Sequence, residues 1–439
     1  MILVFERGKI ADFFGTFFEV GYVVVEGERI AAVGPGPAPE APGASRIDLE
    51  GRLLTPSLVN AHAHLYSSLA RGLPLKVFSP TRFGEILEQL WWKLDRALDL
   101  DGVYHSARVG ALDHLRSGVT VVFDHHASPS AIEGSLGAIK RAVAEVGLRA
   151  DLCYEVTDRG GLRERDLGLK ENIRFAQEEA DGKRFSAHMG LHASFTLSDE
   201  TLAKAAAAAE PLGLAFHTHL AEGKEDPTDA LQKYGLRTAE RLDKFGLLIP
   251  GTLLVHGIHL SQAELDLLAA RPASVVHNPR SNMNNAVGAA QISAMLAKGV
   301  KVALGTDGFG TDMIGELLAA RLLAHHATGL PTTLPDPELL AIFRRNYELA
   351  ERFFGLPFGK LASGFAADFV VWDYNPPTPV HAGNLLGHFL FGHISGGLRP
   401  YLVVGQGRVL HRNGQVETVD EKAVLDQARA AAQRLWSKV

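Results

Sequence analysis

The sequence predicts an α/β fold, namely a (β/α)8 TIM-type barrel with a small β-sandwich formed by both ends of the chain. Three observations support this prediction. Eight short apolar runs alternate with helical stretches from about residue 53 to about residue 359. Both ends of the chain carry short strand-like runs separated by turn residues. The first central run ends in His-Ala-His, whereas an open doubly wound sheet normally has a glycine-rich turn after its first strand.

The eight central runs are rich in valine, leucine and alanine, which is typical of parallel strands buried on both faces. Amphipathic stretches such as LGAIKRAVAEVG and DETLAKAAAAAEPLG lie between them and predict helices. The runs are LLTPSLVNAHAH (53–64), VTVVFDHH (119–126), LRADLCYEV (148–156), FSAHMGLHA (185–193), LAFHTHL (214–220), TLLVHGI (252–258), ASVVHNP (273–279) and VKVALGTD (300–307).

The two ends share a pattern of short strand-like runs separated by turn residues. It is seen in MILVFERGKI and YVVVEGERIAAVG near the start and in LRPYLVVGQGRVLHRNG near the end. We therefore predict four segments. Residues 1–55 and 360–418 form the two parts of the β-sandwich, residues 56–359 form the barrel, and residues 419–439 form a C-terminal helix with its alanines and leucines on one stripe.

The composition limits the class of protein. The 439 residues carry a formal net charge of −6 and no long basic run, which argues against nucleic acid or anionic lipid as a partner. The single cysteine, Cys153, excludes a disulfide within the chain. No apolar run is long enough to span a bilayer, and the first residues lack a signal-peptide pattern. We expect a cytoplasmic protein.

Histidine or aspartate stands at the end of nearly every central run. Because active sites of such barrels lie at the carboxyl ends of the strands, these side chains predict the functional site. They are His62 and His64, His125 and His126, His192, His217 and His219, His256, His277, and Asp307.

The pair His62 and His64 predicts a metal site. Side chains two apart in a strand share a face, so both rings point into the barrel, where unpaired imidazoles are costly. A divalent ion satisfies them, because neutral imidazole is a common ligand of zinc and iron. The fifth run holds a second His-x-His, and we choose His219, nearer the barrel mouth, as ligand. With Asp307 this gives four ligands and leaves a position open for water.

The sequence favours one divalent ion per chain, zinc with iron as the alternative. Barrels that hold two ions commonly bridge them with a carboxylated lysine from the fourth strand. Here the only nearby lysine, Lys183, precedes that strand.

The motifs LVNAHAH, HTHLAEG, LLVHGIHLS, HNPRSNMNNAVG and LGTDG occur in the order and spacing of the amidohydrolase superfamily. The chain resembles its mononuclear deaminase branch, which includes cytosine, guanine and 8-oxoguanine deaminases, over nearly its whole length. It is most similar there to the SsnA-type aminohydrolases. One departure is HLYSS, where purine deaminases of the branch often have glutamine after the histidine pair, so a ring contact made by that glutamine is missing.

The resemblance implies a role for each motif residue. His62, His64, His219 and Asp307 match the metal ligands. Glu222 matches the proton shuttle, His256 the residue that hydrogen-bonds the attacking water, and His192 a position that often touches substrate. The implied reaction is hydrolytic: Asp307 and His256 take a proton from water, Glu222 protonates a ring nitrogen, and an amino group leaves as ammonia.

Several roles stay open at this level. Arg71 and His126 either hydrogen-bond ring carbonyls of the substrate or have surface roles. Residues 65–96 form either a lid over the substrate or a contact in which Trp91 and Trp92 pack on the barrel or at a dimer interface.

The implied function is a deaminase (EC 3.5.4-like) that converts an amino-substituted, purine- or pterin-like heterocycle to its oxo product and ammonia. The alternatives are a hydrolase with another leaving group, such as chloride from a triazine or a formimino nitrogen, and a non-catalytic protein of the same fold. The second alternative is disfavoured because the four ligand positions, Glu222 and His256 are present together. We expect a small-molecule partner and a homodimer or higher homo-oligomer.

Overall fold

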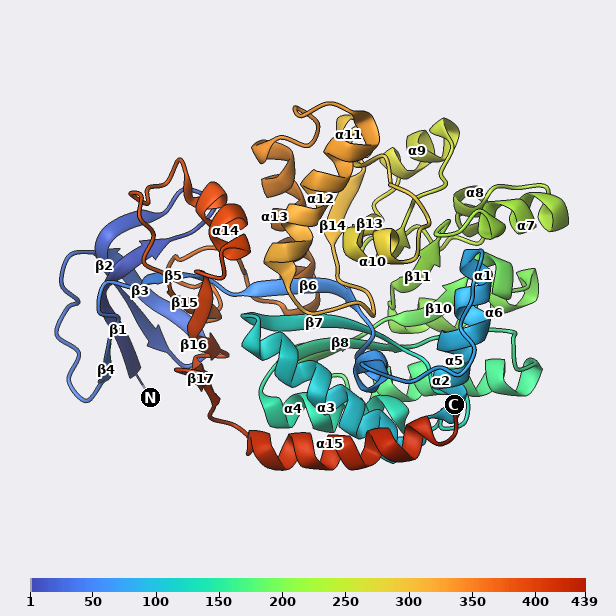
Figure 1. Cartoon of the computed structure of the whole chain (residues 1–439), viewed down its shortest axis with the longest axis horizontal. Helices are drawn as coiled ribbons and strands as arrows, with labels where there is room; N and C mark the ends of the chain where they lie inside the picture. Colours follow the sequence, from blue (N-terminus) through green and yellow to red (C-terminus); the bar gives the residue numbers. More distant parts are fainter. Residues whose placement is uncertain (1) are drawn as a thin grey trace.

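The computed structural model describes residues 2–439, and it consists of a β-sheet body beside a barrel of strands and helices (Figure 1). The last helix, α15 (Glu421–Trp436), runs beneath the barrel and packs along α3 (Leu100–Arg116). Among the residues described, no helix combines the length and the apolar character needed to cross a membrane.

The barrel is built from parallel strands that correspond to the eight predicted runs. They pair as a four-stranded and a five-stranded sheet. The isolated bridges Val156–Leu191 and Ala63–Asp307 join the edges of these two sheets and close the barrel. The strands are β6 (Leu58–Ala63), β7 (Val119–His126), β8 (Arg149–Tyr154), β9 (Phe185–Ala187), β10 (Met189–Ala193), β11 (Phe216–Leu220), β12 (Leu253–His256), β13 (Ser274–His277) and β14 (Lys301–Leu304). The predicted (β/α)8 fold is therefore confirmed.

Helices cover the barrel, and several begin where the sequence places a capping side chain. Asp99, Ser198, Ser261 and Asp312 each accept a backbone hydrogen bond at the first turn of their helix, which satisfies N–H groups that lack a partner in the helix. The remaining helices are α4 (Ser135–Val146), α5 (Leu162–Glu178), α6 (Asp199–Ala209), α7 (Glu225–Tyr234), α8 (Thr238–Lys244), α9 (Gln262–Ala269), α10 (Pro279–Asn284), α11 (Ile292–Ala297), α12 (Met313–Thr328) and α13 (Asp336–Phe354).

Both ends of the chain contribute to a single nine-stranded sheet in the order β18-β17-β16-β15-β5-β1-β2-β3, with β4 paired to β1. The sheet curls, since Arg29 at the start of β3 bridges to Ala366 just before β15, and it encloses its own apolar core around Phe5 and Phe369. Its strands are β1 (Ile2–Ala11), β2 (Phe17–Glu26), β3 (Arg29–Pro35), β4 (Ser45–Asp48), β5 (Leu53–Pro56), β15 (Phe369–Asp373), β16 (Arg399–Gly405), β17 (Arg408–Arg412) and β18 (Gln415–Val416).

Three details differ from the sequence-based expectation. The first run is two strands, because β5 joins the terminal sheet before β6 enters the barrel. The fourth run is interrupted at His188, whose Nδ1 bonds the buried carboxylate of Asp151 at 2.5 Å. The segment 360–418 also holds a helix, α14 (Leu385–Ile394), and residues 65–96 include the short helices α1 (Phe83–Ile86) and α2 (Trp92–Ala97).

Candidate functional site

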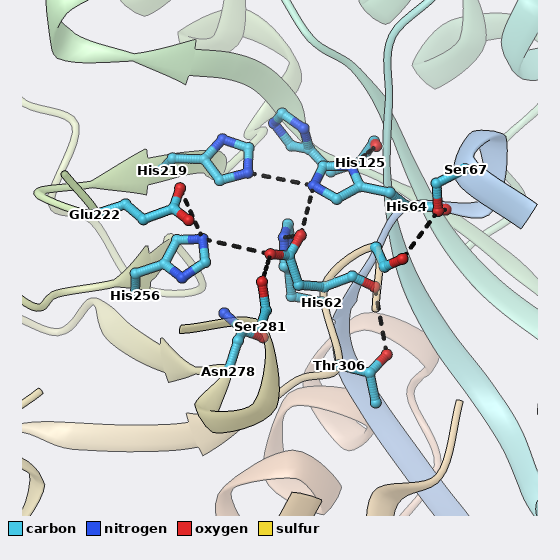
Figure 2. Close-up of polar contacts among 12 residues, drawn as sticks. His62, His64, Ser67, His125, His219, Glu222, His256, Asn278, Ser281 and Thr306 are labelled. Carbon is cyan, nitrogen blue, oxygen red and sulfur yellow. Dashed lines mark hydrogen bonds and ion pairs between the residues drawn. The ribbon is translucent and has the colours of Figure 1, made fainter. Parts of the chain in front are cut away.

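Four side chains from the first, fifth and eighth barrel strands meet at the barrel mouth (Figure 2). The ligand-type atoms of His62, His64, His219 and Asp307 all lie within 4.8 Å of one another. Nε2 of His64 lies 3.0 Å from Oδ1 of Asp307, and Nε2 of His62 lies 3.5 Å from the same oxygen. The four residues predicted as metal ligands are thus brought together.

The donor set fits a divalent cation. Nε2 of His219 faces Nε2 of His64 at 3.3 Å, and Nε2 of His62 is buried without a hydrogen-bond partner among the residues described. Burial lowers the pKa of His62 to about 3 and that of His219 well below its ordinary value, so both rings are neutral. Three nitrogen lone pairs and one carboxylate converging on a common point suit zinc or iron.

The other ring nitrogens fix the orientation of these histidines. Nδ1 of His64 donates to the carbonyl oxygen of His125 at 2.5 Å, and Nδ1 of His219 donates to that of His192 at 3.0 Å. Nδ1 of His62 lies 2.8 Å from Nε2 of the deeper His217. Hydrogen bonds of this kind set the tautomer that presents Nε2 to a metal, which gives His217 a structural role as the partner of His62.

A second group adjoins the first. Nε2 of His256 lies 3.3 Å from Oε2 of Glu222 and 3.8 Å from Oδ2 of Asp307. Nδ1 of His256 is 2.8 Å from Oδ1 of Asn282, so this nitrogen carries the proton and Nε2 offers a lone pair to the site. Burial lowers the pKa of His256, and the ring is therefore a neutral proton acceptor.

Glu222 has the character of an acid. Burial, followed by the charge of Asp307, raises the pKa of the Glu222 carboxyl well above its ordinary value. Asn285 donates to Oε1 of Glu222 at 3.2 Å and orients the group. The raised pKa favours the protonated carboxyl, which can deliver a proton.

The backbone at these positions is unusual. His256 and Asp307 have φ angles of 76° and 56°, and Ala221, next to Glu222, has 49°. Such angles are uncommon for residues other than glycine and concentrate at functional sites, where the surrounding structure holds them.

Three of the four candidate metal ligands, His64, His219 and Asp307, line a cavity of about 330 Å³. This volume lies in the range of small-molecule sites. The segment 65–96 supplies much of the wall, including Phe83, Leu87, Trp91 and Trp92, while Glu222 and His192 reach the cavity from the barrel. This placement favours the lid interpretation of residues 65–96 over the dimer contact.

Of the three predicted substrate contacts, only His192 is buried at the cavity. Arg71 lines its outer part, but the side chain is 74% exposed and pairs with Asp113 at 2.6 Å. His126 lies outside the cavity lining: its Nε2 bonds Ser128 at 2.8 Å, because alternation along β7 turns it away from the face that carries His125. The substrate-binding role predicted for His126 has no support in this geometry.

Sequence reasoning missed Glu155, which lines the cavity together with Asp95. Glu155 is the first residue after β8, the third barrel strand. Asp307 lies three residues after the end of β14, the eighth. A carboxylate after a barrel strand was the available signal. Ser281, whose hydroxyl donates to Oδ2 of Asp307 at 2.5 Å, was also missed because it lies on α10, outside any strand.

Known proteins match the whole length of this chain. Residues 53–409 match the amidohydrolase family. The chain is 34% identical to a 5-methylthioadenosine/S-adenosylhomocysteine deaminase from Desulforudis audaxviator, with 100% of both chains covered. It is 33% identical to a 5'-deoxyadenosine deaminase from Methanothermobacter thermautotrophicus, covering 94% of this chain and 95% of that protein.

Among solved structures, an adenosine deaminase from Xanthomonas campestris with bound zinc superposes with a TM-score of 0.85. The two share 24% identity, and the superposition covers 99% of this chain and 98% of the other, which supports the fold. The match to the family spans the whole barrel and part of the terminal sheet, and both of these relatives exceed 30% identity over nearly the full length. The chain therefore belongs to the amidohydrolase family, as its sequence predicts.

Proposed function

We propose that this chain deaminates an adenine-type nucleoside with a modified 5' position, with one zinc ion at His62, His64, His219 and Asp307. The coarser prediction, an enzyme that hydrolyses a carbon–nitrogen bond of an amino-substituted heterocycle, is confirmed, since both relatives are named deaminases of such compounds. The observation that supports the proposal best is the contact between the two groups that share Asp307. The first group, His62, His64, His219 and Asp307, can hold a cation. The second group, Glu222, His256 and Asp307, joins a protonated carboxyl to a neutral imidazole.

His62, His64, His219 and Asp307 would hold a divalent ion, which would supply a Lewis acid that lowers the pKa of a nearby water to about 7. His256 orients that water through its Nε2 lone pair, and Asp307 accepts its proton. Glu222 donates its proton to the ring nitrogen beside the carbon that bears the amino group, which makes that carbon electrophilic.

Water oxygen then adds to the carbon, and the carbon–nitrogen bond to the amino group breaks. Glu222, now ionised, takes up the proton held by Asp307 and delivers it to the leaving nitrogen, which departs as ammonia. The hydroxyl group left on the carbon gives its proton to Glu222, so the amidine of the ring becomes an amide and the site returns to its starting protonation state.

The test is a screen for ammonia release by the zinc-loaded protein. The panel holds 5'-deoxyadenosine, 5-methylthioadenosine, adenosine, adenine, guanine, a pterin and a chlorotriazine. Turnover that is fastest on the nucleosides supports the proposal. Release of chloride from the triazine without ammonia release from any other compound would favour the alternative leaving group.

Three further predictions accompany this function. We infer that the ion is zinc. Elemental analysis of protein prepared without added metal would contradict this inference if it found iron. The homodimer or higher homo-oligomer and the cytoplasmic location stay predictions, and light scattering coupled to gel filtration would test the former.

A further inference from the structure

The mechanism does not use the buried carboxylate of Glu155, which lines the cavity. Glu155 is 5% exposed, and its neighbour Asp95 is 1% exposed. Both line the cavity, and both lie beside the guanidinium of Arg159, which does not line it. Two carboxylates therefore face the cavity with a single cation behind them, and this wall has a surplus of negative charge.

The carboxylate of Glu155 retains capacity to accept hydrogen bonds. Its contacts with Nδ1 of His125, the guanidinium of Arg159 and Nε2 of His192 measure 3.4, 3.6 and 4.0 Å. All three are longer than the roughly 2.7–2.9 Å of a charge-assisted hydrogen bond. Arg159 instead bonds Asp95 at 2.8 Å and stacks on Trp92, with its carbon Cζ 4.6 Å from the ring centre.

A buried carboxylate without strong donors is costly unless a ligand supplies them. Glu155 is also close to the reacting centre, because one of its oxygens lies within 4.8 Å of a ring nitrogen of His219. A heterocycle held beside His219 thus comes within reach of Glu155.

We propose that Glu155 is a specificity-determining residue that accepts hydrogen bonds from N–H or O–H donors of the substrate, and that this wall excludes substrates with an anion at the same end. The inference rests on the proposed function. The donors come from one of two sources: a ring N–H of a free base, or the sugar hydroxyls of a nucleoside.

The experiment compares paired probes in the zinc-loaded wild-type protein and in Glu155→Gln. Adenosine is compared with 2',3'-dideoxyadenosine, which lacks the two sugar hydroxyls, and adenine with 9-methyladenine, in which a methyl group replaces the N9 hydrogen. Glutamine keeps the shape but loses the charge, so the member that carries the donor should lose roughly 10- to 100-fold in KM, with a much smaller change in kcat. The member without the donor should change little, and the pair that responds identifies the source.

Glu171→Gln is the matched control. Glu171 is 2% exposed, pairs with Arg174 and lies on α5, which follows the same barrel strand, but it does not line the cavity. Glu171→Gln should change KM for both members of each pair equally, if it changes KM at all. Glu155→Asp, which keeps the charge on a shorter side chain, should restore part of the discrimination that Glu155→Gln loses.

Three results separate the possible failures. Equal losses for both members of each pair in Glu155→Gln would contradict the inference and assign Glu155 a structural role. Loss of zinc from Glu155→Gln would also contradict it, because Glu155 would then be a ligand together with His125 and His219. If the wild-type protein releases ammonia neither from the four probes nor from 5'-deoxyadenosine and 5-methylthioadenosine, the proposed function fails as well.

Discussion

Replacing Glu222 by glutamine separates proton transfer from metal binding. Glu222 lies on the loop beyond β11, contacts His256 at 3.3 Å and receives a hydrogen bond from Asn285 at 3.2 Å. Glutamine has nearly the same shape: its carbonyl oxygen can accept from Asn285, and its amide can donate to Nε2 of His256. Fold and metal content should therefore stay unchanged.

The rate should fall steeply. A general acid–base step is worth roughly 10²–10⁴-fold, and Glu222 serves two transfers, so the loss should reach about 10⁴-fold or more. This corresponds to about 5.5 kcal/mol of transition-state stabilisation at about 1.4 kcal/mol for each factor of ten. Substrate affinity should change much less than rate, since the ring nitrogen still meets a hydrogen-bond donor.

The assay measures ammonia release and zinc content of Glu222→Gln and wild type on the best compound from the screen, with Glu171→Gln as a control for the loss of a buried carboxylate. Turnover close to that of wild type would refute the reasoning. His256 or Asp307 would then have to carry both transfers.

Other predictions address the metal, the architecture and acid stability. Elemental analysis should find one ion per chain, which His64→Ala and His219→Asn lose; two tightly held ions, or unchanged binding in His64→Ala, would argue for a different site. Residues 56–359 alone should be poorly soluble, because Val370, Trp372 and Leu410 of the terminal sheet share the apolar core of the barrel, and a stable truncated protein would contradict this. Burial lowers the pKa of His114 to about 4 from 6.5, so the unfolded chain binds a proton that the folded chain does not. His114 should thus contribute about 3 kcal/mol of stability above pH 6.5 that is lost as the pH falls toward 4, and urea unfolding of His114→Gln should show a weaker pH dependence in that window.

The strands and the metal-type cluster could be predicted from sequence because their signals are local. A run such as VKVALGTD identifies a buried strand and its polar end together, and two residues in one strand, as in His62 and His64, necessarily share a face. The order of polar ends along the chain then gives their order around the barrel.

The sequence could not predict the side chains whose roles depend on contacts between distant segments. His125 and His126 are adjacent, and only the register of β7 decides that one faces the barrel interior and the other Ser128. Asp95 and Glu155 are brought to one wall by the packing of the segment 65–96 over the strands. The helix α14 interrupts the second part of the terminal sheet, and its apolar residues gave no signal that separated it from the strands around it.

The closing seam of the barrel has a consequence for assembly. The backbone nitrogens of Thr306 and Asp307 donate to the carbonyl oxygen of His62, and the side chain of Asn60 bonds that of Thr306, 246 positions away. Two of the four candidate metal ligands, His62 and Asp307, thus stand on opposite sides of the junction that closes the barrel. During synthesis His62 and His64 emerge early, but their carboxylate partner arrives only after the eighth strand. A cation that binds all four ligands recognises a completed ring, so metal binding stabilises the long-range pairing that closes the barrel.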